Sequence, residues 1–257
     1  MALRSLAVRL RQQDWAAVTI EILIVIVGVF VGLQVSNWND ERKNNARGRE
    51  YLLRFHDELL HDADGLTLIS RFWQQVADSG VIAIAYAEEG VLAHGSAWQT
   101  LLAYHEASQV WPYRKPDVTF QEIRSTGNML LIRNDALRDR IARHYSAGAG
   151  SQVTEVLGLI PRYREHVRGL MPWKVQRYIW TNCYNSDGAI QTFKACESPM
   201  GERDALALLE QLRNTPELTA ELRFWMINVH SGLGLMHDVQ SEARSLARDL
   251  TRERDRR

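Results

Sequence analysis

An apolar run from Ala16 to Asn37 constrains this chain more than any other feature of its sequence. The run contains one ionisable residue, Glu21, and lies between Trp15 and Trp38. At 1.5 Å per residue, a helix of this length spans about 33 Å, which matches a hydrocarbon core of about 30 Å. Tryptophan is enriched at membrane interfaces, so Trp15 and Trp38 are the expected membrane-interface anchors. The run therefore predicts a single N-terminal transmembrane helix.

A buried core helix and a cleaved signal peptide are the two other interpretations of this run. The run is long for the apolar part of a signal peptide, and no small-residue cleavage site precedes the polar stretch Trp38–Glu41. An uncleaved signal anchor fits best. The predicted organisation is a short cytoplasmic N-terminus over residues 1–15, a transmembrane helix over residues 16–37 and a soluble helical domain over residues 38–257.

The orientation of the span depends on its flanking charges and on two distant cysteines. The flanking basic residues nearly balance, with Arg4, Arg9 and Arg11 before the span and Arg42, Lys43, Arg47 and Arg49 after it. Cys183 and Cys196 flank the turn-prone stretch Tyr184–Gly188, which could bring the two thiols together. A disulfide persists only in an oxidising compartment, whereas two reduced, buried thiols in a cytosolic domain are the alternative. We expect a disulfide, a cytoplasmic N-terminus and an exported C-terminal domain.

One face of the predicted span carries its acid and its glycines together. At 100° per residue, Val25, Gly28, Gly32 and Val35 fall within about 40° of Glu21. Two glycines four residues apart let helix backbones approach closely. This transmembrane oligomerisation face predicts a homo-oligomer in which Glu21 is directed toward its partners. The alternative is that glycine is merely common in membrane helices and that Glu21 reaches the lipid headgroups. A role for Glu21 in proton or ion transfer is a sharper hypothesis.

The region around the membrane exit resembles a known family. The motif Glu21-Ile22, the apolar run and the segment Gln34–Lys43 are similar to the N-terminal signature of an uncharacterised family of bacterial single-pass membrane proteins, the domain of unknown function 6090. Later similar blocks are Tyr51-Leu52, Phe120–Ile123, Ser125–Gly127, Leu131–Asn134 and His144-Tyr145. The resemblance covers about residues 17–145 of the chain. It implies a single-pass topology and a bacterial origin and supplies no chemistry. Combined with the orientation expected from the cysteines, it predicts a protein of the bacterial inner membrane with a periplasmic C-terminal domain.

Two long amphipathic patterns predict an all-α fold beyond the membrane. The first seam, with steps of three and four residues, is Leu52, Phe55, Leu59, Asp62, Leu66, Ile69, Trp73 and Val76. The second seam keeps the same spacing through Leu218, Leu222, Trp225, Val229, Gly232, Met236, Val239, Ala243, Leu246 and Leu250. Such spacing favours packing against another long helix. We expect a helical bundle with long, coiled-coil-like first and last helices that run antiparallel.

Shorter helices are expected between the two seams. Predicted ranges are Ala97–Ser108, Thr119–Thr126, Asp135–Ala147 and Ser151–Leu170, the last interrupted at Pro161. Asn134 and Thr215 are the expected N-caps of the helices that follow them, with Pro216 as the first residue of the final helix. The cysteine-containing segment over residues 171–199 is predicted to be irregular.

Composition and motifs argue against several functional classes. The 31 basic and 31 acidic residues cancel, and nucleic-acid binding by broad phosphate neutralisation needs a basic excess. Glu58 and His61 have the spacing of a di-iron ligand pair, but a second such motif is missing. A solvated acidic face that includes Asp57, Asp62 and Asp64 is expected instead. Phosphate loops, zinc-protease motifs and nucleophile elbows are also missing. We expect neither a catalytic residue nor a metal or other cofactor.

The sequence leaves three functional hypotheses. The leading one is a non-enzymatic bitopic protein that acts as an oligomerising scaffold or binds a membrane protein partner. The second is an extracytoplasmic ligand-sensing bundle with the segment Met171–Pro199 as a lid. A deep pocket lined by Trp173, Trp180 and Tyr184 would favour it, and a filled core would not. The third is a proton- or ion-coupled single-span component that uses Glu21.

Overall fold

The computed structural model describes residues 15–146, 149–158, 160–186 and 191–256. Over these ranges the chain is almost entirely helical, with one two-stranded sheet, which confirms the all-α prediction. The chain forms two compact units, Met1–Glu50 and Tyr51–Arg257, and each is described by itself. Of the predicted cytoplasmic segment, residues 1–14 lie outside the described ranges.

The first unit contains the apolar part of helix α2 (Trp15–Glu89). The described part of this helix from Thr19 contains a stretch that is apolar and long enough to cross a membrane, with a mean hydropathy of 2.2 over its most apolar window. None of that window is buried within the chain, unlike the core helix of a soluble protein. The first unit therefore presents an apolar helix whose side chains lack protein packing among the described residues.

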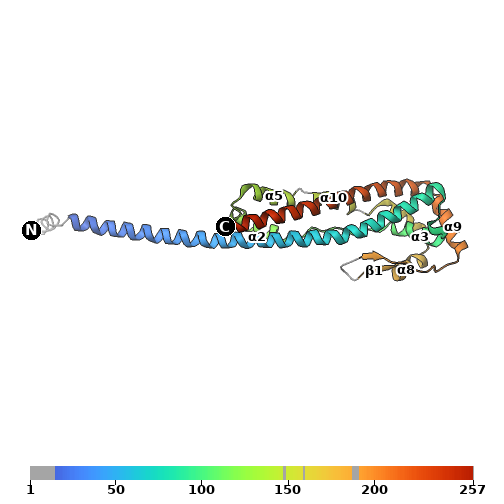
Figure 1. Cartoon of the computed structure of the whole chain (residues 1–257), viewed down its shortest axis with the longest axis horizontal. Coiled ribbons are helices and arrows are strands. Elements are labelled where there is room, and N and C mark those ends of the chain that lie inside the picture. The colour runs from blue at the N-terminus through green and yellow to red at the C-terminus, as the bar shows by residue number, and fades with distance from the viewer. Residues whose placement is uncertain (1–14, 147–148, 159, 187–190, 257) are drawn as a thin grey trace, which may run out of the picture. The chain divides into compact units, whose positions relative to one another are not determined.

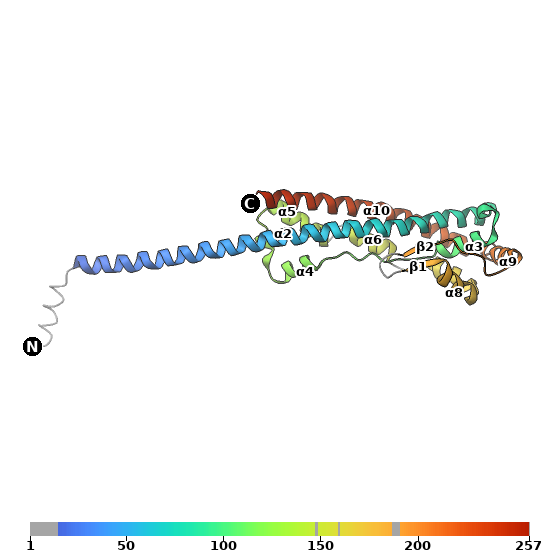
Figure 2. The same cartoon turned by 60° about the horizontal axis from the view of Figure 1, so that its bottom comes forward.

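The second unit is organised around the later part of α2 and helix α10 (Pro216–Asp255), which run antiparallel (Figure 1 and Figure 2). Arg223 Nε lies 2.7 Å from Glu88 Oε1, near the end of α2. Further along α10, Gln240 Nε2 donates to the Ala63 carbonyl at 2.9 Å, much earlier in α2. All ten predicted seam residues of α10 are buried, as are seven of the eight on α2, with Ile69 partly buried. The antiparallel pairing is confirmed.

Gly232, the one weak residue of the α10 seam, is explained by a third helix. A Cβ atom at this position would lie 2.4 Å from Leu157 Cδ1, at the end of α6 (Ala149–Leu157). Leu157 is itself buried, so it has little room to move. The absence of a side chain at Gly232 therefore lets α6 pack closely on α10.

The shorter helices follow the predicted ranges closely. They are α3 (Ala97–Glu106), α4 (Val118–Ser125), α5 (Asp135–Ser146) and α7 (Arg162–Leu170), with 3-10 turns η1 (Ala93–Gly95) and η2 (Asn128–Leu131). The predicted cap of α5 forms, since the Leu137 backbone N–H donates to Asn134 Oδ1 at 3.1 Å. Thr215 stands at the N-cap of α10, but its hydroxyl donates to the Gln211 carbonyl instead of capping the helix.

The prediction of an irregular segment over residues 171–199 is wrong in part. It contains helix α8 (Trp173–Asn182) and an antiparallel hairpin of β1 (Tyr184–Ser186) and β2 (Gln191–Phe193), in which Tyr184 pairs with Phe193. Helix α9 (Glu202–Arg213) follows and was not predicted. The amphipathic pattern of α8 is hard to recognise in the sequence because large aromatic side chains occupy its exposed side, whereas its buried side carries Val175 and Ile179.

Candidate functional sites

The predicted transmembrane oligomerisation face is accessible along its length. Glu21, Val25, Gly28, Gly32 and Val35 are all exposed in the single chain. A Cβ atom built on either glycine meets no other atom within 4 Å. A second helix could therefore approach this face without a clash, although association itself stays a prediction.

The two predicted interface anchors lie on the same helix, α2. Trp15 is its first residue. Trp38 is 64% exposed, and the Arg42 guanidinium carbon lies 6.0 Å from the centre of its ring. This pairing places a cation beside an amphipathic ring, an arrangement that suits a membrane–water interface.

The predicted disulfide forms between Cys183 and Cys196, whose Cα atoms are 5.1 Å apart. It closes the β1–β2 hairpin, and the Lys194 backbone N–H donates to the Cys183 carbonyl at 2.9 Å. Trp98 of α3 donates its indole N–H to the Cys196 carbonyl at 3.2 Å. Asp187 and Gly188, at the expected turn, lie outside the described residues. The disulfide thus joins the two ends of the hairpin, and the Trp98 hydrogen bond attaches the hairpin to α3.

Among the described residues, Trp173, Trp180 and Tyr184 are not arranged around the deep pocket that would favour a ligand-sensing role. Trp173 is 71% exposed and Trp180 is 53% exposed, so neither is positioned to enclose a ligand. The Trp180 and Tyr184 rings stack with their centres 4.7 Å apart, which fills the space between them. An open, mainly apolar cleft of about 710 Å³ lies elsewhere, where α6 and α7 meet α10, with Ile160 and Phe224 in its lining.

Asp62 is buried instead of belonging to a solvated acidic face, and this prediction is corrected. Its carboxylate oxygens share the single Tyr113 hydroxyl donor, which lies 2.9 Å from Oδ1 and 3.1 Å from Oδ2. Burial raises the pKa of the Asp62 carboxyl to about 6, although the Tyr113 hydrogen bond opposes the change. Glu58 accepts from the Thr119 backbone N–H at 2.9 Å, while His61 is exposed. Glu58 and His61 therefore do not form a ligand pair.

Further polar groups surround Asp62. Lys115 Nζ donates to the His144 carbonyl at 2.6 Å, and burial lowers the pKa of Lys115 while the charge of Asp62 raises it. Burial lowers the pKa of His144 to about 3, and its Nε2 atom is buried without a hydrogen-bond partner. Among the described residues, no group of three histidine, cysteine or acidic side chains is arranged to hold a metal ion. The cluster is a buried polar layer between the two apolar cores of the second unit.

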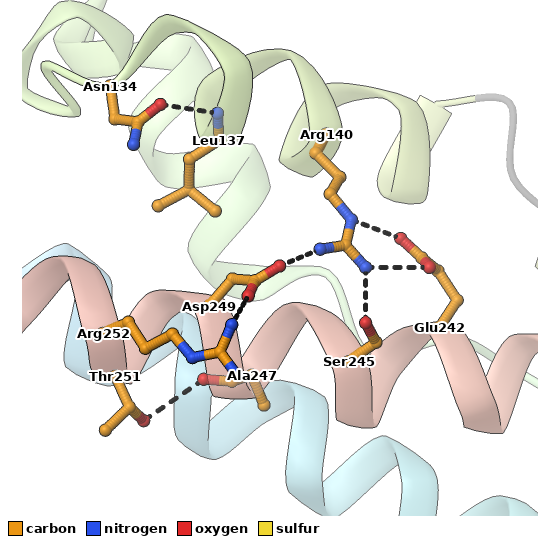
Figure 3. A network of polar contacts seen from close by, with 9 residues as sticks. All are labelled: Asn134, Leu137, Arg140, Glu242, Ser245, Ala247, Asp249, Thr251 and Arg252. Atoms are coloured by element: carbon orange, nitrogen blue, oxygen red, sulfur yellow. Dashed lines mark hydrogen bonds and ion pairs between the residues drawn. The ribbon is translucent and has the colours of Figure 1, made fainter.

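Arg140 of α5 fixes that helix to α10 through acidic partners (Figure 3). Its Nε lies 2.9 Å from Glu242 Oε1 and its Nη2 lies 3.0 Å from Glu242 Oε2, a two-pronged arrangement. Nη1 also donates to Asp249, and Nη2 donates to Ser245 Oγ at 2.9 Å. The Glu242 hydrogen bonds raise the pKa of Arg140 above its usual range. Charge-assisted pairs of this geometry are among the strongest hydrogen bonds in proteins.

Glu106, at the end of α3, gives the second unit a pH-dependent stability. The Ser79 hydroxyl donates to Glu106 Oε2 at 2.9 Å, and burial raises the pKa of this carboxyl to about 7. The folded protein thus retains a proton here that the unfolded chain releases near its ordinary pKa of 4.5. The contribution of this group to the free energy of unfolding therefore falls as the pH rises from 4.5 to about 7.

Replacing Glu106 with glutamine should remove this pH-dependent loss. At about pH 8 we expect E106Q to be more stable than the unmodified protein by about 2–3 kcal/mol, with similar stability at about pH 4. Thermal unfolding at both pH values measures the difference. His105 and His144 titrate in both proteins, so the comparison isolates position 106. If E106Q were less stable than the unmodified protein at the higher pH, the raised pKa of Glu106 would be contradicted.

Comparisons of the chain with models of protein families, with curated proteins and with solved structures found no match. The resemblance of residues 17–145 to the domain of unknown function 6090 therefore stays a prediction. The function must be inferred from the arrangement of the described residues.

Proposed function

We propose that the protein is a non-enzymatic, single-pass component of the bacterial inner membrane that assembles with itself or with a membrane protein partner. Its contact surface is the transmembrane oligomerisation face. The observation that carries the proposal is the open space around Gly28 and Gly32 on a helix with a wholly unburied apolar window. In lipid, small residues let helix backbones approach closely enough for dispersion and polar contacts to hold them together.

The disulfide supports the orientation that we propose. A bond between Cys183 and Cys196 persists in the periplasm and is reduced in the cytoplasm. The second unit is therefore periplasmic, and the N-terminus is cytoplasmic. The carboxyl group of Glu21 lies on the assembly face, where a hydrogen bond to a partner helix would offset the cost of placing it in lipid.

Substituting both glycines should disrupt assembly. We expect Gly28→Ile combined with Gly32→Ile to reduce the crosslinked oligomer in native membranes at least about tenfold, because bulky side chains keep the backbones apart. Phe30→Ile is the matched control, since residue 30 lies on the opposite side of the helix at 100° per residue. Crosslinking that is equal in the double variant and the control would remove this face from the proposal.

A proton-permeability assay on reconstituted vesicles separates the scaffold from the proton- or ion-coupled alternative. Glu21→Gln keeps the hydrogen-bonding capacity of the side chain but cannot transfer a proton. A scaffold carrying this change should assemble as well as the unmodified protein and leave the proton permeability of reconstituted vesicles unchanged. A permeability that depends on Glu21 would favour the coupled component.

A ligand-sensing domain is a second candidate, favoured by the apolar cleft beside Phe224. Mainly apolar clefts of several hundred Å³ are typical of small-molecule sites. The cleft is open, with Ile160 63% exposed and Phe224 71% exposed. A ligand or a partner segment would bury these side chains, so protection of the cleft from solvent on addition of a membrane extract would support this candidate.

A further inference from the structure

Two arginines of α7 are partly buried against neutral partners. Arg164 and Arg168 are four residues apart and so lie on one face of the helix. Arg164 Nη1 donates to the Ser108 carbonyl at 2.7 Å and to Gln109 Oε1 at 3.3 Å. Arg168 Nε donates to Ser108 Oγ at 3.1 Å. Within the described part of the chain, neither guanidinium is paired with a carboxylate.

Polar atoms remain unsatisfied around this pair. Arg168 Nη2 is buried and has no hydrogen-bond partner among the residues that the structure describes. His105, at the end of α3, is only 2% exposed, and its Nδ1 also has no hydrogen-bond partner within the described ranges. Buried groups of this kind are rare in folded proteins, and each one calls for an explanation such as a bound ion.

The electrostatics of the cluster show an excess of positive charge. Burial and the charge of Arg164 together lower the pKa of Arg168 to about 9. Burial and the charges of both arginines hold the pKa of His105 at about 3, so its ring is neutral at physiological pH. Arg164 and Arg168 thus lie close enough to affect the pKa values of each other and of the neutral His105 ring, in a partly desolvated setting.

Arg140 provides an internal comparison. That guanidinium is bound by Glu242 and Asp249, and its pKa is raised. For Arg164 and Arg168 the pKa is lowered, because burial is not offset by an acid. Arg140, which joins two helices, therefore has carboxylate partners. Arg164 and Arg168 have no carboxylate partner among the described residues.

We propose that Arg164 and Arg168 bind a phosphate-type oxyanion, with His105 as a neutral hydrogen-bonding group beside them. The planar guanidinium matches the spacing of phosphate oxygens, and a partly desolvated pair strengthens the attraction. Ser108 and Gln109 hold Arg164 and Arg168 through their neutral oxygens and leave other N–H groups for the ligand. The site belongs to the second unit and does not depend on the proposed transmembrane assembly.

Calorimetric titration of the full chain in neutral detergent with inorganic phosphate tests the site. At constant ionic strength we expect one phosphate per chain, and binding about 30-fold or more weaker in Arg168→Gln. Arg162→Gln is the matched control, because Arg162 is exposed on the same helix. Titration with glycerol phosphate distinguishes a lipid-type phosphomonoester from free phosphate. An absence of saturable binding, or equal binding by Arg168→Gln and the control, would overturn the proposal.

Thermal unfolding separates a binding role from a structural one. Phosphate should raise the Tm of the unmodified protein and leave that of Arg168→Met unchanged. Without phosphate, Arg168→Met should be at least as stable as the unmodified protein, because a buried charge without an acidic partner has been removed. If Arg168→Met instead lowers the Tm and keeps the full response to phosphate, Arg168 is a structural residue and the proposed site is wrong.

Discussion

Replacing Trp225 with alanine is expected to reduce the free energy of unfolding by about 3–5 kcal/mol, with a fall in Tm of about 10 °C or more. Trp225 is buried in the α10 seam, and its ring lies 5.8 Å from that of the fully buried Trp73. Its indole N–H also donates to the Ala107 carbonyl, at the end of α3, at 2.9 Å. The alanine variant therefore loses packing with α2 and a hydrogen bond to α3 at once.

The neighbouring residue is a matched control for this prediction. Phe224 is 71% exposed, so Phe224→Ala removes a similar aromatic side chain from the cleft surface and should change stability by at most about 0.5 kcal/mol. Trp225→Phe keeps much of the ring packing but leaves the Ala107 carbonyl without its donor, so its loss should be intermediate. Equal Tm values for the alanine variants at 224 and 225 would show that the seam does not stabilise the second unit.

Removing the disulfide is expected to have the second-largest effect. Substituting serine for both Cys183 and Cys196 should lower stability by about 3 kcal/mol, because the unfolded chain is no longer closed into a loop of about 14 residues. The corresponding fall in Tm is about 6–12 °C. Tyr184 and Phe193, on the two strands of the hairpin, both pack on the main core, so loosening the hairpin also weakens that core.

Reduction provides the control for the disulfide. A reductant should lower the Tm of the unmodified protein by the same amount and have no effect on the double-serine variant. Thiol labelling of protein extracted under non-reducing conditions also tests the orientation. Two free thiols in such an extract would contradict the periplasmic assignment of the second unit.

The long helices were predictable because their burial is periodic. Each seam residue is one of a repeated set in contact with a second helix, so the apolar spacing alone indicates both the helix and its buried face. Gly232 seemed to weaken this pattern because its role depends on Leu157 of α6, which no local spacing reveals. The cap at Asn134 was predictable because capping is a contact between residues three positions apart.

The buried polar groups could not be predicted in the same way. Asp62 was the one polar residue of the first seam, and that position was the only signal of its burial, since Tyr113 lies far away in the sequence. Arg164 and Arg168 follow the ordinary spacing of a solvated helix, and only the fold brings them onto Ser108. Helix α9 was missed because its buried face, Ala205, Leu208, Leu209 and Leu212, spans little more than two turns.

The antiparallel arrangement of α2 and α10 determines how the second unit responds to mechanical tension. Tyr51, where the unit begins, belongs to the same apolar cluster as Leu250, near the end of α10. A pull between these two points peels the helices apart one layer at a time, because only the outermost contacts resist it at any moment. The cluster around Leu246 should open first, and Trp225 should separate from Trp73 only after it.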